Sequence, residues 1–276
     1  IGMELYKMRR SLMSKALIAV AVALALLVVL TVGIEVAINA NTHSELLRLP
    51  ASLEMATTQG ELNPAIILII ILIGSSAGGE LSIGTVRLMF TRGPWRGQFL
   101  LAKYGAALVC SVLGVLGMAL LGVIAGQLFN VLSGVPQNWH VLSAAWSVHV
   151  LFYLLVTMLS WCMYAVVAVF FGVLGRSTAA GIGGALMWFF VEPFVSNILT
   201  AAGNFSRGGI GIFLLALPDY LMGNNARALQ LNQAHYLFGS TSSSQSDLNA
   251  LITQVVYLVV LISLTWWLTE SRDVTN

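Results

Sequence analysis

Six long apolar runs limit what this chain can fold into. They fall at residues 16–38, 64–79, 104–132, 145–174, 178–199 and 248–268. The hydrocarbon core of a bilayer is about 30 Å thick, and a helix needs roughly 20 mostly apolar residues to cross it. With 58% hydrophobic and 9% charged residues, the remainder holds no soluble domain of useful size. We therefore expect an all-α polytopic membrane protein with six transmembrane helices in a single domain, residues 1–276.

The distribution of positive residues predicts the orientation of these spans. Cytoplasmic segments near span ends are enriched in Lys and Arg. With a cytoplasmic N-terminus, most of the 13 such residues fall on the inner side: Lys7, Arg9, Arg10, Lys15, Arg87, Arg92, Arg96, Lys103, Arg176 and Arg272. The outer side then holds Arg48, Arg207 and Arg227. Six spans leave both termini in the cytoplasm.

Two segments outside the spans have an expected structure. Residues 2–15 place Leu5 and Met8 at helical spacing among basic residues, which is typical of an amphipathic helix lying on a membrane surface. In the outer segment 200–247, the apolar run 208–223 is only about 16 residues long and is interrupted by a proline and an aspartate. That length favours a re-entrant or interfacial helix over a seventh span.

The sequence lacks the motifs of common enzymes. It contains no G-x-x-x-x-G-K-[ST] phosphate loop, no H-E-x-x-H and no G-x-S-x-G. Candidate metal ligands are scattered: His43, His140, His149, His235, Cys110 and Cys162. We therefore expect no catalytic residue, metal or cofactor in this chain. An intramembrane enzyme would need Glu192, His149 and Cys162 to converge at one depth.

Glu192 and Glu35 are acidic residues placed toward the outer ends of predicted spans. Ionisable residues inside a membrane are rare and commonly functional. Because Glu192 precedes the helix-breaking Pro193, this pair is a candidate for a gate or a translocation pathway, and Glu35 is a second candidate. Alternatively, Glu192 reaches the outer interface, is protonated, or bonds to backbone groups that the proline frees.

Residues 80–103 form the segment where a soluble partner could reach the spans. Cytoplasmic loops of membrane proteins are generally basic, because positive residues tend to stay inside during insertion. This segment also has a sequence pattern that predicts local structure. Gly84 and Thr85 can begin a short helix over residues 85–91, with Thr85 as N-cap, and Arg92 follows it. A short helix across the membrane face suits docking into a groove on another protein.

These residues resemble the membrane subunits of type-2 ATP-binding-cassette (ABC) exporters. The stretch ELYKMRRS, residues 4–11, is similar to the opening of that family, and the 80–103 segment is similar to its first cytoplasmic loop. The matching positions in the loop are Glu80, Gly84-Thr85, Arg87, Pro94-Trp95-Arg96 and Ala102-Lys103. Trp95 departs from the small polar residue of the family pattern. The resemblance covers the six-span plan, but its specific motifs lie in the first hundred residues.

The resemblance implies a permease that pairs with a second copy of itself or with a homologous chain, each bound to a cytosolic ABC ATPase. ATP and Mg²⁺ would belong to that ATPase, and this chain would be no enzyme. The residues implied to couple it to the ATPase are Leu5, Lys7, Met8, Glu80, Gly84, Thr85, Arg87, Arg92, Pro94 and Arg96. Re-entrant helices before the last span would close the pathway toward the outside.

The expected function is ATP-driven export of an amphipathic or lipid-like substrate, because the pathway would be apolar with few fixed charges. The expected location is the cell (inner) membrane of a prokaryote, in contact with membrane lipids. A net charge of +2 gives no argument for binding nucleic acid. The alternative is a non-transporting membrane scaffold or anchor subunit of a larger complex, and co-purification of an ATPase with a phosphate loop would separate the two.

Overall fold

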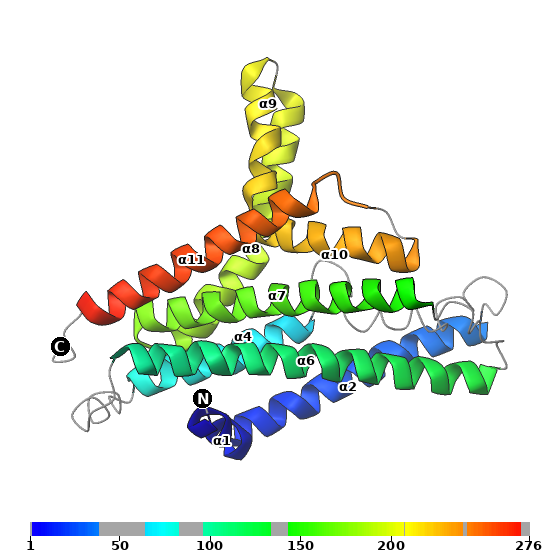
Figure 1. The fold of residues 1–276 in the computed structure, drawn as a ribbon, viewed down its shortest axis with the longest axis horizontal. Coiled ribbons are helices and arrows are strands. Elements are labelled where there is room, and N and C mark those ends of the chain that lie inside the picture. The colour runs from blue at the N-terminus through cyan, green and yellow to red at the C-terminus, as the bar shows by residue number, and fades with distance from the viewer. Residues whose placement is uncertain are drawn as a thin grey trace.

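The computed structural model describes residues 2–38, 64–82, 96–133, 143–206, 208–239 and 242–271. Over these residues the chain is helical and contains no strand, which confirms the expected all-α class. The elements are α1 (Gly2–Arg10), α2 (Leu12–Ile38), α4 (Pro64–Ser82), α6 (Arg96–Ser133), α7 (Ala144–Gly175), α8 (Thr178–Phe205), α9 (Gly209–Ala216), the 3₁₀ helix η3 (Leu217–Tyr220), α10 (Met222–Phe238) and α11 (Asp247–Ser271) (Figure 1).

Five of the described helices are long and apolar enough to cross a membrane, so the chain is an integral membrane protein. The stretches are Ala65–Ser82, Gly97–Leu128, Ala144–Gly175, Thr178–Phe205 and Asp247–Ser271. They coincide with the last five of the six predicted spans. α2 covers the first predicted span, and its described part includes the apolar stretch Leu12–Leu24. The count of six spans and the positions of the termini stay predictions.

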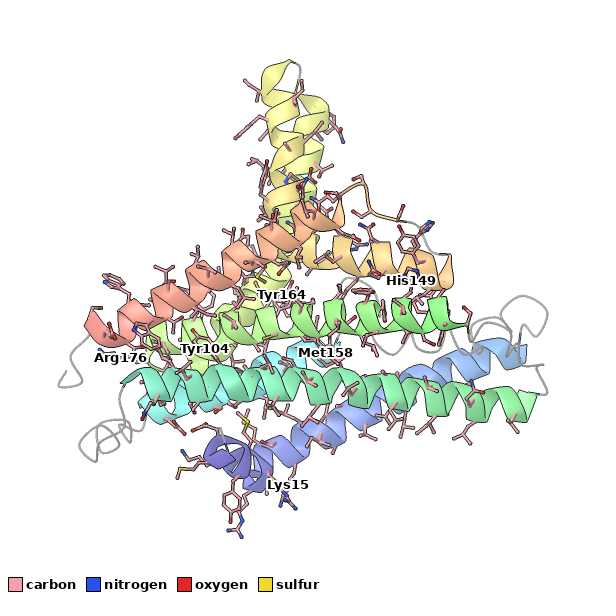
Figure 2. The ribbon with its side chains drawn as sticks, in the orientation of Figure 1. Lys15, Tyr104, His149, Met158, Tyr164 and Arg176 are labelled. Atoms are coloured by element: carbon pink, nitrogen blue, oxygen red, sulfur yellow. The ribbon has the colours of Figure 1, made fainter. Side chains whose placement is uncertain are left out.

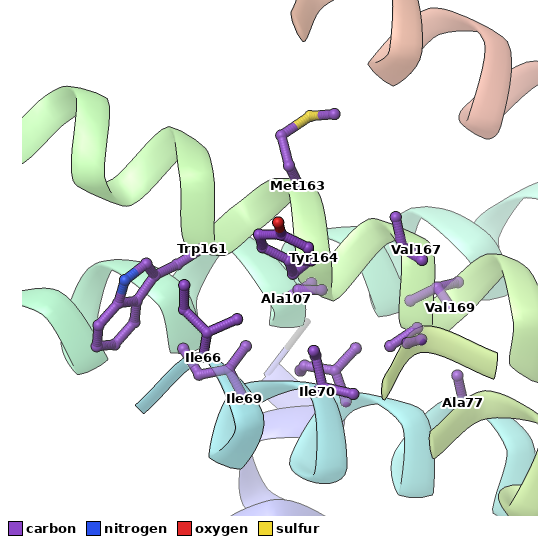
Figure 3. Packing of buried hydrophobic residues seen from close by; sticks show 14 of the residues in the cluster. Ile66, Ile69, Ile70, Ala77, Ala107, Trp161, Met163, Tyr164, Val167 and Val169 are labelled. Atoms are coloured by element: carbon purple, nitrogen blue, oxygen red, sulfur yellow. The ribbon is translucent and has the colours of Figure 1, made fainter. Parts of the chain in front are cut away.

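The core of the fold lies between α4, α7 and α8, which all contact one another. On α4, Ile66, Ile69 and Ile70 lie against the side of α7 that carries Trp161 and Tyr164 (Figure 3). In a water-soluble protein, burial of each such side chain stabilises the fold by roughly 1.5–3 kcal/mol. Between helices in lipid this hydrophobic contribution is absent, so close packing has to stabilise the contact instead. The tight contact of these three helices is therefore what fixes their arrangement.

Glycines bring the three helices to backbone contact. A Cβ on Gly74 of α4 would lie 2.9 Å from the carbonyl carbon of Gly181 in α8, and a Cβ on Gly181 would lie 2.8 Å from the carbonyl oxygen of Gly74. A Cβ on Gly172 of α7 would lie 3.2 Å from the backbone nitrogen of Gly78. Small residues permit this approach, which is the usual packing device of membrane helices.

The C-terminal half of α8 extends away from α4 and α7. It forms a helical hairpin with α9 that projects from the rest of the molecule (Figure 1). Pro193 lies inside α8. The apolar run 208–223, expected to form one helix, is divided among α9, η3 and the start of α10, and Pro218 lies in the first turn of η3. Whether this part re-enters the membrane stays a prediction. The chain then returns through α10, which packs on α7 and α11.

Candidate functional site

Four charged side chains meet where α1 approaches the end of α4 and the start of α6. We call Glu4, Lys7, Glu80 and Lys103 the basal charge cluster. Lys103 Nζ donates to Glu4 Oε2 at 2.6 Å, and Lys7 Nζ donates to Glu80 Oε1 at 2.8 Å. Lys103 Nζ also lies 3.0 Å from Glu80 Oε2, and Lys7 Nζ lies 3.5 Å from Glu4 Oε1. The cluster therefore ties α1 to both helices that flank residues 83–95.

Local helix geometry brings α1 into this position. Glu4, Lys7 and Met8 share one face, because side chains three or four residues apart in a helix are neighbours. Met8 is buried, and its sulfur accepts a hydrogen bond of 3.8 Å from the Cys110 thiol of α6. Ser11 then separates α1 from α2, and its Oγ accepts from the Ser14 backbone N–H as an N-cap does. α1 can thus lie against the bundle while α2 runs in another direction.

Lys103 is the most deeply buried member of the cluster. Its side chain is 2% exposed and that of Glu4 is 7% exposed. An ammonium group has three donors, and Lys103 directs all of them to Glu4 Oε2, the Ser76 carbonyl at 3.0 Å and the Ser76 hydroxyl at 3.1 Å. The contact with Glu80 Oε2 is therefore an ion pair without a hydrogen bond of its own. Two acids and two lysines cancel their formal charges, which makes burial of the group tolerable.

The electrostatic environment shifts the pKa of two members of the cluster. Burial by itself raises the pKa of Glu4, but the hydrogen bond and charge of Lys103, with the charge of Lys7, lower it below its usual value of 4.5. Burial by itself lowers the pKa of Lys7, but Glu80 and Glu4 raise it above its usual value of 10.5. Both shifts favour the charged forms, so these two residues stay paired near neutral pH.

Of the ten residues expected to couple the chain to an ATPase, the structure brings together Lys7 and Glu80 and buries Met8 beside them. Leu5 lies in α1 and Arg96 begins α6, but their side chains are outside the described part of the structure. Gly84, Thr85, Arg87, Arg92, Pro94 and the predicted helix 85–91 also lie outside the described residues.

Sequence reasoning omitted Glu4 and Lys103 from this set. Lys103 was counted as a cytoplasmic charge and as a matching position of the loop pattern, and Glu4 only as part of a motif, but neither was given a role in coupling. One signal in the sequence could have found them. Lys103 stands at the edge of an apolar run, with no acidic residue within a helical turn of it. Its charge therefore needs a partner from elsewhere in the chain.

A second polar region lies where α8 meets α10. Glu192 is 6% exposed, and its Oε1 accepts a hydrogen bond from the backbone N–H of Gly223, 31 residues away in the first turn of α10. The first N–H groups of a helix have no partner within the helix, so a carboxyl group is favourable there. Glu192 thus bonds to backbone, as one alternative expected, but the backbone belongs to α10 and not to the turn that Pro193 opens. The Glu35 side chain lies outside the described part.

A cavity of about 100 Å³ lies beside Glu192. The polar side chains that line it come from three helices: Ser160, Tyr164, Glu192, Ser196, Asn197, Asn224, Arg227 and Gln230. Tyr164 projects from α7 toward the side on which α10 and α11 lie (Figure 2). Glu192 Oε2 is buried and makes no hydrogen bond of normal geometry, although the indole N–H of Trp188 and the backbone N–H of Asn224 lie near the carboxyl group.

Neighbouring hydrogen bonds fix the start of α10. Asn224 Nδ2 donates to the Ser196 hydroxyl of α8 at 2.7 Å, and Gln254 Nε2 of α11 donates to the Met222 carbonyl at 2.6 Å. His149 lies away from this region, stacked on Tyr236 with ring centroids 5.0 Å apart (Figure 2). Three helices thus hold the Glu192 site in place.

No metal centre is formed within the described ranges, where no three His, Cys, Asp or Glu side chains gather. Cys110 and Cys162 are free thiols. We therefore take the basal charge cluster and the Glu192 site as the candidate sites of the described chain.

Comparison with known proteins places the chain in a family. No curated protein matches it. The family described as "Protein of unknown function (DUF2705)" matches residues 53–275, which is well over half of the 276-residue chain and includes α4 to α11. The chain therefore belongs to the DUF2705 family.

Proposed function

We propose that this chain is the permease subunit of an ABC exporter that moves an amphipathic or lipid-like substrate. The observation that carries the proposal is the basal charge cluster. It joins α1 to α4 and α6, the helices on either side of the 83–95 segment. α1 and that segment are the two elements expected to contact a cytosolic ATPase. A partner that moved either element would therefore act on both.

The cluster would serve as the mechanical link between the ATPase and the spans. Lys103 and Glu80 sit on α6 and α4, and α4 packs closely on α7 and α8. Close-packed helices move as units and do not deform continuously, so displacement of the 83–95 segment would shift α4 against its neighbours. Two alternating arrangements of the spans would then give access to either side of the membrane.

The proposal assigns ATP and Mg²⁺ to a separate cytosolic subunit. It also assigns a second copy of this chain, or a homologous one, as the partner within the membrane, which would be the inner membrane of a prokaryote. Glu192 and Pro193 would form part of the pathway, because they place a polar, bent segment of α8 beside the cavity.

The test first looks for an ABC ATPase encoded beside the gene and then co-expresses it with the chain. We expect the ATPase to co-purify in low salt and to dissociate as salt rises, because exposed arginines would form part of the contact. The complex in proteoliposomes should flip a fluorescent phospholipid only with ATP. Arg87→Glu combined with Arg96→Glu should abolish this flipping, and Arg48→Glu, on the predicted outer side, is the matched control.

Two outcomes would overturn the proposal. Full ATP-dependent flipping by the Arg87→Glu, Arg96→Glu variant would remove the coupling assignment. An ATPase that binds without driving any flipping would instead favour the non-transporting scaffold or anchor subunit.

A further inference from the structure

Three cations lie on the outer surface of the molecule where α1 meets α2. Arg9 and Arg10 end α1, Lys15 lies in the first turn of α2, and all three side chains are exposed. Lys15 projects away from the helix bundle (Figure 2). None of the three forms an ion pair with another described residue. We call Arg9, Arg10 and Lys15 the outer basic patch.

No acidic side chain of α1 balances this patch. Glu4 is the one acidic residue among residues 1–34, and the sequence from Glu80 to Glu192 has none in between. Glu4 and Glu80 both belong to the basal charge cluster, where Lys7 and Lys103 bind them. Their pairing against the bundle therefore leaves the exposed end of α1 with positive charge that only an outside partner can neutralise.

Large apolar side chains are exposed among the cations. Met3, Tyr6 and Leu12 are 70%, 54% and 85% exposed. The Arg10 guanidinium lies over the Tyr6 ring, 5.0 Å from its centroid. Basic and apolar side chains mixed on one exposed helix suit a membrane surface, where the stems of the basic residues lie along apolar groups and their charged ends reach the headgroups.

The chain itself indicates the depth of the patch. An apolar helical stretch, Leu12–Leu24, begins directly after Ser11 and contains Lys15. Positive residues at the end of an apolar helix extend toward the headgroup region, where anionic phospholipids carry their charge. A soluble acidic protein would have to displace lipid to reach Lys15, so the membrane is the better fit of the two anionic partners.

We propose that the outer basic patch binds anionic phospholipid headgroups and that Met3, Tyr6 and Leu12 insert between the lipids beside them. The inference goes beyond the proposed function and does not depend on it, because it requires only a membrane protein. Phosphate oxygens accept charge-assisted hydrogen bonds from guanidinium and ammonium groups. Each basic residue near an anionic surface contributes about fivefold in affinity, so the patch contributes about a hundredfold at low salt.

Lipid binding on this side would complement the ion pairs on the other side of α1. The basal charge cluster ties α1 to α4 and α6, and the headgroups would hold its opposite face on the bilayer. The charge of the membrane thereby controls how firmly α1 is held in place.

The experiment measures hydrogen exchange of the α1 amides in the purified full chain, without ATPase or ATP. The chain is placed in nanodiscs of phosphatidylcholine, or of phosphatidylcholine mixed with anionic phosphatidylglycerol. At low salt we expect the anionic lipid to slow exchange by about tenfold or more, and this gain should shrink as salt rises. Equal exchange in the two kinds of nanodisc would overturn the inference.

Two sets of substitutions make the test specific. Arg9→Gln, Arg10→Gln and Lys15→Gln together remove the charges and should abolish the gain. Arg9→Lys, Arg10→Lys and Lys15→Arg together keep the charges and should keep the gain. Each gain is measured against the same variant in phosphatidylcholine, so a change in helix stability cancels. A gain that persists in the glutamine set would contradict the proposal.

Two further measurements separate lipid from protein as the partner. In Tyr6→Trp, the fluorescence added over that of the original chain should be quenched more by brominated phosphatidylglycerol than by brominated phosphatidylcholine. Equal quenching by the two lipids would argue against an anionic lipid at this face. Slower exchange on adding an ATPase that co-purifies, with no gain from phosphatidylglycerol, would assign the patch to an acidic protein and overturn the inference.

Discussion

Lys103 Nζ lies 2.6 Å from Glu4 Oε2, although 99 residues separate the two in the sequence. The pair is almost fully buried and joins the first helix of the chain to the start of α6. Breaking a buried ion pair by removing one partner is costly, because the other charge stays buried without compensation. The basal charge cluster should therefore respond very differently to the loss of each member.

Lys103→Met should be the most damaging change in the cluster. It leaves both Glu4 and Glu80 without their buried cation, and we expect a loss of about 3–5 kcal/mol in the free energy of unfolding. Denaturant titration of the purified chain in detergent measures this loss. Lys15→Met, which removes an exposed lysine from α2, is the control and should change stability little. A similar effect of the two substitutions would contradict the role given to Lys103.

Acid should loosen the attachment of α1 before alkali does. Because the pKa of Glu4 is lower in the folded chain than its usual 4.5, its stabilising contribution is present above pH 4.5 and is lost as pH falls through the folded value. Because the pKa of Lys7 is raised, its contribution is fully present below pH 10.5 and is lost only as pH rises through its higher folded pKa. Hydrogen exchange of the α1 amides, compared at pH 3 and pH 6, should show protection falling in acid. In Glu4→Gln this difference should shrink, and an unchanged difference would assign the acid sensitivity to another group.

Two glycines of α8 should respond in opposite directions to alanine. Gly181→Ala puts a methyl group 2.8 Å from the Gly74 carbonyl oxygen. Because this neighbour is backbone and not a flexible side chain, it cannot easily move away. We expect a loss of about 1–3 kcal/mol from overpacking. Gly183→Ala meets nothing within 4 Å and should gain about 0.5–1 kcal/mol, the ordinary helical preference for alanine. Melting temperatures of the two variants decide this, and equal shifts would argue against close contact of α4 and α8.

Ser177 should contribute measurably as the N-cap of α8. Its Oγ accepts a hydrogen bond of 3.1 Å from the Ala180 backbone N–H. Ser177→Ala should cost about 1 kcal/mol of stability, whereas Ser177→Asp should largely keep it, because aspartate caps equally well. Thermal unfolding of both variants tests the assignment, and equal loss in the two would show that another property of Ser177 matters.

Most helices could be predicted because their signal is local. A run of apolar residues long enough to cross a bilayer has few alternatives to a helix. The run 145–174 became α7, Ala144–Gly175, with Ser143 as its N-cap. The end of α8 was predicted less well: the helix continues from the expected residue 199 to Phe205, because the buried Gly203 there packs against Leu215 of α9.

The candidate sites were predicted in part. Glu192 stood out because a carboxyl group inside an apolar run is costly, but its bond to Gly223 joins residues 31 apart and has no sequence signature. The resemblance gave Lys7 and Glu80 a coupling role, whereas it matched Lys103, the lysine that contacts both acids of the cluster, without giving it one. The polar cavity arises from side chains on several helices and could not be read from any one of them.

The sequence by itself determined that this is an all-helical membrane protein and where its apolar helices lie, since both follow from the composition of single segments. Only the tertiary structure decided that Lys103 pairs with Glu4, that α8 and α9 form a projecting hairpin, and that Glu192 caps α10. These depend on which helices approach one another, and that is set by steric fit at positions such as Gly74 and Gly181, which apolar patterning alone does not specify.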